Sequence, residues 1–148
     1  MTPVLSGRWQ TRVFLTLILG LPVTAFFWWL FEDEDYLTFA ILGYVTIIGL
    51  AWDLLYNHLQ TYRWDHDWPP AFQLAAGVVE ALLIAALIWG LPLVDLELPL
   101  VDPDDIEWWQ FLLHYSAVWC ALFLASLSVM RIFFPRWRFF GGQVVTFR

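Results

Sequence analysis

Four long apolar segments constrain this chain more than any other feature of its sequence. A helix needs about 20 mostly apolar residues to cross the roughly 30 Å hydrocarbon core of a bilayer. Segments of this length run over about 13–31, 36–56, 71–91 and 108–130. They are continuous rather than alternating, which excludes a β-barrel, and helices satisfy their own backbone hydrogen bonds in lipid. The sequence therefore predicts an all-α membrane protein, a single domain in which four transmembrane helices form an antiparallel up-down bundle.

Charged residues are sorted between the gaps that separate these segments. All basic residues lie before the first segment, between the second and third, or after the fourth: Arg8, Arg12, Arg63, Arg131, Arg136, Arg138 and Arg148. Most acids lie in the other two gaps: Glu32, Asp33, Glu34, Asp35, Asp95, Glu97, Asp102, Asp104, Asp105 and Glu107. Arginine is retained in short cytoplasmic loops during insertion. We therefore expect a multi-pass protein of a bacterial inner membrane, with both termini and a basic, aromatic tail (131–148) in the cytoplasm.

Composition agrees with membrane residence and narrows the functional classes. Hydrophobic residues make up 61% of the chain, far more than in ordinary soluble proteins. Tryptophans gather near the ends of the apolar segments, as in the aromatic belt of membrane proteins. A net charge of −7 gives no basis for binding nucleic acid. The lone cysteine, Cys120, excludes an internal disulfide and a cysteine-cluster metal site.

Motifs that carry known chemistry are missing from the sequence. No His-Glu-x-x-His, Gly-x-Ser-x-Gly, Cys-x-x-Cys or Walker pattern occurs. The loop after the second segment holds His58, Asp65, His66 and Asp67, which are metal-ligand types. Their spacing matches no metal site, so we interpret them as a solvated turn. The sequence favours a non-enzyme and requires no cofactor and no metal.

Three ionisable residues lie inside the apolar segments. Asp53 is near the inner edge, Glu80 near the midplane and His114 nearer the outer side. A charge at the centre of a spanning helix costs at least about 2.5–3.5 kcal/mol, so such residues pair or stay neutral. One interpretation is a proton path through His114, Glu80 and Asp53. The other is helix–helix bonding, with Asp53 pairing to Arg63 or Arg131 and Glu80 bonding a neighbour. Polar residues at helical spacing extend this predicted network: Asn57 and Gln73.

Small residues at helical spacing predict where the helices approach closely. Stripes on the second, third and fourth segments consist of Gly43, Gly49, Gly77, Ala117, Ala121 and Ala125. Small residues let membrane helices approach and let polar side chains bridge them. These three helices are therefore expected to share an interior, with the first helix peripheral and kinked at Pro22.

Three functions remain open from the sequence. The first is an accessory subunit that packs against other integral subunits of a larger, energy-transducing membrane complex. Partner docking would then use an acidic outer face, formed by Asp102, Asp104, Asp105 and Glu107, and Trp137 of the aromatic tail. The acidic outer face would also suit a basic soluble protein. The second is a proton-coupled small transporter or channel that uses Glu80. The third is a subunit that binds haem, pigment or quinone near His114 and the tryptophans.

Overall fold

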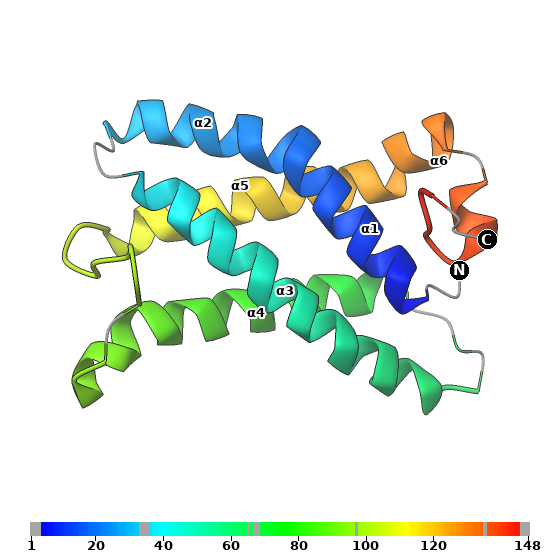
Figure 1. Cartoon of the computed structure of the whole chain (residues 1–148), viewed down its shortest axis with the longest axis horizontal. Helices are drawn as coiled ribbons and strands as arrows, with labels where there is room; N and C mark the ends of the chain where they lie inside the picture. The colour runs from blue at the N-terminus through cyan, green and yellow to red at the C-terminus, as the bar shows by residue number, and fades with distance from the viewer. Residues whose placement is uncertain are drawn as a thin grey trace.

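Four helices long and apolar enough to cross a membrane make up most of the protein. The computed structural model describes residues 4–32, 36–64, 66, 69–96, 98–134 and 136–145. The four candidate spans are Leu5–Leu30, Leu37–Thr61, Pro70–Val94 and Trp108–Phe133, and they pack side by side as a bundle (Figure 1). The predicted all-α membrane architecture is confirmed.

Each span is built from one or more helical elements. The first comprises α1 (Leu5–Leu15), the π-helix η1 (Thr16–Gly20) and α2 (Leu21–Leu30). The second is α3 (Leu37–Thr61), and the third joins α4 (Pro70–Gly90) to the 3₁₀-helix η2 (Leu91–Val94). The fourth joins α5 (Trp108–Leu127) to α6 (Val129–Phe133), and the 3₁₀-helix η3 (Trp137–Phe140) follows.

The first span begins well before the predicted start at residue 13. Arg8 and Arg12 were expected to flank the membrane, yet both lie within α1. The helix continues through them because their side chains have polar partners on other helices, as described below. The second and fourth spans also extend past their predicted ends, to Thr61 and Phe133.

A π-helical turn interrupts the first span at Thr16–Gly20. Pro22 has no backbone N–H to donate, and the Leu21 N–H reaches back five residues to the Thr16 carbonyl. On a regular α-helix, the side chains of residues twelve positions apart point about 120° away from each other around the helix axis. Because the π-helical turn takes up one extra residue, this angle falls to about 20° in the first span. Arg12 and Thr24 consequently face the same interior.

The first span is central rather than peripheral, so the prediction that it packs at the edge was wrong. α1 and α2 both pack against α3 and α5. The chain's first and last described segments meet, because the Val4 N–H donates to the Gly141 carbonyl at 2.8 Å. Both termini therefore lie at one end of the bundle (Figure 1).

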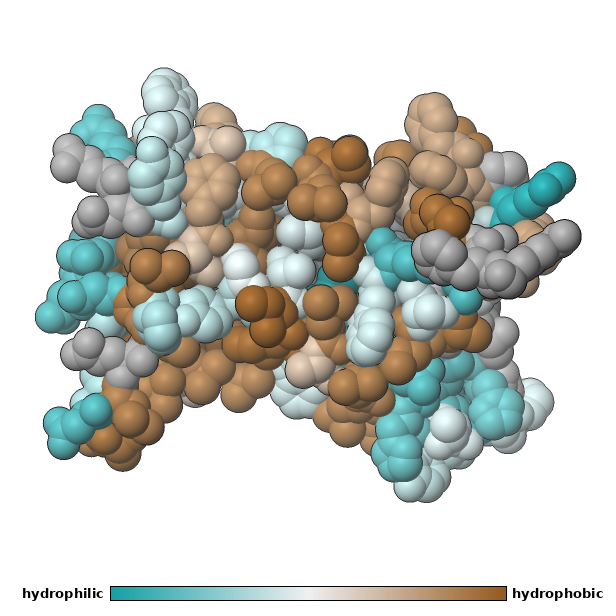
Figure 2. Space-filling model, in the orientation of Figure 1, coloured by the Kyte–Doolittle hydropathy of each residue, from teal (hydrophilic) through white to brown (hydrophobic). Residues whose placement is uncertain are grey.

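The two ends of the bundle differ in charge. We call the end with both termini the arginine end, since it holds Arg8, Arg63, Arg131 and Arg136. The opposite end, with Glu32, Asp95, Asp102 and Asp104, is the acidic end. Polar surface gathers at both ends, and apolar surface covers the middle (Figure 2). A buried cluster that includes Ile41, Ile84 and Phe111 fills the bundle toward the acidic end. A smaller one, with Leu15, Ala125 and Met130, lies toward the arginine end.

Candidate functional site

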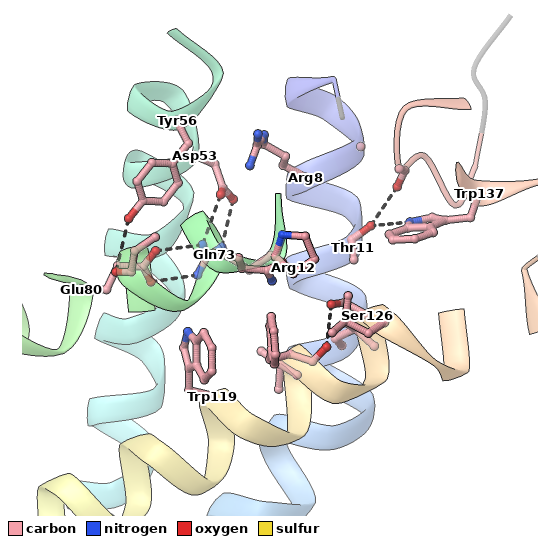
Figure 3. Close-up of a pocket in the computed structure, with 18 of the residues that line it drawn as sticks. Arg8, Thr11, Arg12, Asp53, Tyr56, Gln73, Glu80, Trp119, Ser126 and Trp137 are labelled. Carbon is pink, nitrogen blue, oxygen red and sulfur yellow. Dashed lines mark hydrogen bonds and ion pairs between the residues drawn. The ribbon is translucent and has the colours of Figure 1, made fainter. Parts of the chain in front are cut away.

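Three charged residues from three helices form one ion-paired cluster inside the bundle. The Arg12 guanidinium of α1 lies between Asp53 of α3 and Glu80 of α4 (Figure 3). Its Nε donates to Asp53 Oδ2 at 2.9 Å, and its Nη2 donates to Asp53 Oδ1 at 3.2 Å. Nη1 and Nη2 donate to the Glu80 oxygens Oε2 and Oε1 at 3.3 and 3.2 Å. Asp53 and Glu80 are each only 4% exposed. We call this cluster the Arg12 triad.

The triad corrects one prediction about the buried acids and completes another. Asp53 was expected to pair with Arg63 or Arg131, and Glu80 was expected to bond a neighbour that the sequence did not identify. Both acids pair with Arg12 instead. At about 1.5 Å per residue, Arg12 lies roughly 10 Å inside the start of α1, which brings its guanidinium level with the two carboxylates.

Two glycines make the close packing around the triad possible. A Cβ on Gly49 would lie 2.1 Å from Arg12 Nη1, so α3 needs a glycine where it passes the guanidinium. A Cβ on Gly77 would lie 2.2 Å from Trp119 Nε1, so α4 needs one where it meets α5. The Tyr115 hydroxyl also donates to the Gly77 carbonyl at 2.8 Å.

A pocket of about 320 Å³ leads from the arginine end to the triad. Its deepest lining residues on the four helices are Leu15, Asp53, Glu80 and Trp119. Beyond this level the apolar cluster around Ile41 and Ile84, which are 0% and 1% exposed, fills the interior. The pocket therefore ends at the triad and does not continue to the acidic end.

The C-terminal segment, residues 136–145, packs against α1 beside this pocket. Trp137 Nε1 donates to Thr11 Oγ1 at 2.7 Å, and Thr11 Oγ1 donates to the Gly142 carbonyl at 2.8 Å. The side-chain carbonyl of Gln10 accepts from the backbone N–H groups of Val144 and Val145 at 2.8 and 2.9 Å. Trp137 and Gly142 both line the pocket, so the segment forms part of its wall.

His114 is buried in a separate contact. It is 1% exposed, and its Nε2 lies 2.9 Å from Thr24 Oγ1, forming a hydrogen bond between α5 and α2. The ring also packs against Phe27 in a T-shaped arrangement. Thr24 and Arg12 are twelve residues apart, about 18 Å along the first span. His114 and Glu80 therefore contact the first helix at different depths and do not form one direct relay.

The other predicted network and packing residues have varied environments. Gln73 lines the pocket, whereas Asn57 is half-buried on α3. Gly43 is exposed, and a Cβ there would meet open space, so its assignment to a helix contact was wrong. On α5, Ala125 is buried, and two further residues of the predicted stripe are half-buried: Ala117 and Ala121.

The residues predicted to dock a partner are divided between opposite ends. The exposed acids lie at the acidic end and comprise Asp102, Asp104, Asp105 and Glu107. Glu107 also caps α5, where its backbone N–H donates to Gln110 Oε1 at 2.9 Å. Trp137 is 7% exposed and bonds Thr11, so its place on a docking surface was wrong. Several predicted loop residues lie outside the described residues: 33–35, 65, 67, 68, 97 and 148.

Among the described residues, no group of three or more His, Cys, Asp or Glu side chains is placed to hold a metal ion. His58 instead meets the Tyr62 hydroxyl at 3.2 Å on an exposed turn of α3.

Sequence reasoning missed several residues that build the pocket, above all Arg12, Thr11, Tyr56 and Trp119. The sequence did contain one indication that Arg12 could pair with the buried acids. Arg8 and Arg12 lie one helical turn apart, and two buried acids in neighbouring spans need a cation within the membrane. Comparison with protein families, with characterised proteins and with solved structures finds no match for this chain.

Proposed function

We propose that this protein is a small membrane-integral binding protein or carrier, which admits a polar group from the arginine end into the pocket above the Arg12 triad. The observation that carries the proposal is the position of the triad at the floor of a pocket. Buried ion pairs contribute little net stability, because desolvation offsets their attraction. Ionisable residues within a membrane commonly mark substrate or ion pathways.

The same charge distribution supports an orientation for the protein. Arg8, Arg63, Arg131 and Arg136 share one end of the bundle, and the positive-inside rule favours the cytoplasm for that end. In this proposal, a bacterial inner membrane holds the chain with both termini in the cytoplasm. The pocket then receives its ligand from the cytoplasm or from the inner leaflet.

The proposal is tested by the reactivity of two adjacent alanines on α4. Ala76 is buried and lines the pocket, whereas Ala75 is exposed on the outer face at almost the same depth. Each is replaced by cysteine in a Cys120→Ser background, and a membrane-impermeant thiol reagent is added to either side of oriented vesicles. We expect Ala76→Cys to react from the arginine side only, because in this proposal the pocket is open to water at that end. Ala75→Cys should react slowly from both sides, because thiolates do not form in lipid. Equal reactivity of the two variants would contradict the proposal.

Proton coupling is a second element of the proposal, supported by the two carboxylates that share one guanidinium. Protonation of one carboxylate would free part of the Arg12 donor set for a ligand. In this scheme, Glu80→Gln abolishes flux driven by a pH gradient in liposomes and leaves the protein monodisperse. Unchanged flux in that variant would remove Glu80 from the coupling mechanism.

An accessory-subunit role is a second candidate, favoured by exposed leucines at the acidic end. Leu93 and Leu100 are each 85% exposed, and Leu96 is 57% exposed, beside the acidic loop. Large apolar side chains exposed together mark protein or membrane contacts. Co-purification from native membranes in mild detergent should then recover a partner, and Leu100→Asp should release it. A monodisperse protein with no stable partner would contradict this role.

Neither candidate requires catalysis or a cofactor. A haem or pigment subunit remains the third alternative, and the absorption spectrum of the purified protein tests it. A visible band that changes in His114→Ala would support this alternative, and a spectrum without a visible band would exclude a haem or pigment.

A further inference from the structure

The pocket has two chemically different walls. The side formed by α1 and α3 is polar and contributes Arg8, Thr11 and Asp53 (Figure 3). The α5 side is mainly apolar and contributes Trp119, Leu122 and Phe123. A pocket divided in this way suits a ligand with a polar and an apolar part. At about 320 Å³ it is near the lower limit for small-molecule sites, so a whole two-chain lipid does not fit inside.

The charge of the pocket is opposite in sign to that of the protein. Three arginines and two carboxylates line it, which gives a formal charge of +1 in a chain of net charge −7. Arg12 is engaged by the two acids, while Arg131 is exposed and lies nearer the arginine end. Arg8 bonds Gln60 at 2.7 Å and is held beside the pocket. Guanidinium groups are the preferred protein ligands of phosphate and carboxylate.

Both α4 and α5 line the pocket toward the arginine end. The two helices touch at Gly77 and Trp119. Nearer the arginine end, Gln73 of α4 and Ser126 of α5 both line the pocket. The outer faces of the same helices are apolar and exposed beside it, with Leu74 49% and Leu124 61% exposed. Apolar surface for a hydrocarbon chain is therefore present both on the α5 side of the pocket and on the outer faces of the two helices.

Building on the proposed function, we propose that the pocket binds the anionic headgroup of a bilayer amphiphile. Arg131 and Arg8 contact its phosphate or carboxylate group. Its hydrocarbon chain runs along Leu122 and Phe123 and leaves between α4 and α5. A free phosphate or carboxylate ion shares the headgroup chemistry but has no chain for the α5 wall.

The experiment measures how ligands protect Ala76→Cys, in the Cys120→Ser background, from a thiol reagent. The protein is placed in phosphatidylcholine nanodiscs, and either phosphatidylglycerol or inorganic phosphate is added. We expect phosphatidylglycerol to slow the modification and inorganic phosphate to leave it unchanged. Arg131→Gln should raise the phosphatidylglycerol concentration needed about 10- to 100-fold, the loss expected for one charged hydrogen bond. Arg136→Gln is the matched control, since Arg136 is exposed at the same end and does not line the pocket.

The outcomes separate this inference from the proposed function. Equal protection by inorganic phosphate and phosphatidylglycerol would overturn the amphiphile and leave a site for soluble anions. Absence of protection by both, with Ala76→Cys still more reactive than Ala75→Cys, would overturn the inference and leave the proposed function standing. An equal rise in the phosphatidylglycerol concentration needed for protection in Arg131→Gln and Arg136→Gln would also overturn the inference, since the effect would then be one of surface charge.

Discussion

Replacing Arg12 by glutamine tests the central physical claim, that one guanidinium is the shared ion-pair partner of two buried carboxylates. The substitution keeps a long polar side chain but removes the charge shared by Asp53 and Glu80. Asp53 and Glu80 are each only 4% exposed at the floor of the pocket, so the few contacts they have with the pocket do not replace the lost charged partner. We therefore expect Arg12→Gln to be among the most destabilising single substitutions in the chain.

The size of the expected stability loss in Arg12→Gln follows from the four hydrogen bonds of the guanidinium. Charge-assisted N–H···O bonds are typically about 2.7–2.9 Å long. Only the bond from Nε to Asp53, at 2.9 Å, falls in that range, and the other three measure 3.2, 3.2 and 3.3 Å. Removing one partner of a buried ion pair costs about 3–5 kcal/mol, and the long bonds favour the lower value, about 3 kcal/mol. For a protein of this size, that loss lowers Tm by about 6–12 °C.

The assay is thermal stability in detergent, read as the fraction of protein that stays monodisperse in size-exclusion chromatography after heating. Arg136→Gln removes an exposed arginine and serves as the control. A second comparison combines Arg12→Gln with Asp53→Asn and Glu80→Gln, which removes all three charges. This triple variant should recover much of the lost stability, because no uncompensated carboxylate remains. An Arg12→Gln protein as stable as the control, or a triple variant no more stable than the single one, would refute the reasoning.

Three glycines give further predictions. Gly49→Ala should displace the Arg12 guanidinium, because its Cβ would lie 2.1 Å from Nη1, and should lower stability by about 1–3 kcal/mol in the same assay. On the same helix, the Cβ of Gly43→Ala would meet open space, so this substitution should stabilise the protein by about 0.5–1 kcal/mol. If both substitutions changed stability in the same direction, the packing described around Gly49 would be contradicted. Gly7→Ala places a Cβ 2.1 Å from the Gly141 carbonyl oxygen and should loosen the C-terminal segment. Limited proteolysis should then cleave that segment faster than in the parent protein, and an unchanged rate would count against this contact.

The four spans could be predicted because membrane insertion depends on local composition. Each apolar segment meets the length requirement by itself, so no knowledge of tertiary contacts was needed. The same locality explains the error at Arg12. A hydropathy rule places an arginine next to an apolar segment outside the membrane, whereas its true position depends on Asp53 and Glu80, which are distant in the sequence. Buried ion pairs join separate helices, and a local pattern does not reveal which residues meet.

The pocket was less predictable than the spans for a related reason. Glu80 and Asp53 stand out as acids in apolar surroundings, and Gln73 shares the expected helix face. Thr11, Tyr56 and other residues of the pocket wall have no unusual neighbours in the sequence. Their role depends on where the helices separate, and that is decided by side-chain volume across the whole bundle. The contact of the C-terminal segment with α1 is likewise a long-range packing result.

The π-helical turn at Thr16–Gly20 has a consequence for how the first helix tolerates changes in length. Deleting one residue within the turn would restore regular α-helical geometry and leave Arg12 and Thr24 facing the same interior. Deleting one residue elsewhere between them would rotate one contact away from the other by about 100°. A single-residue insertion has no such compensating position. The first helix therefore contains one residue more than a regular helix would need to place both contacts, and a first span adapted to a thinner bilayer could lack that residue without loss of either contact.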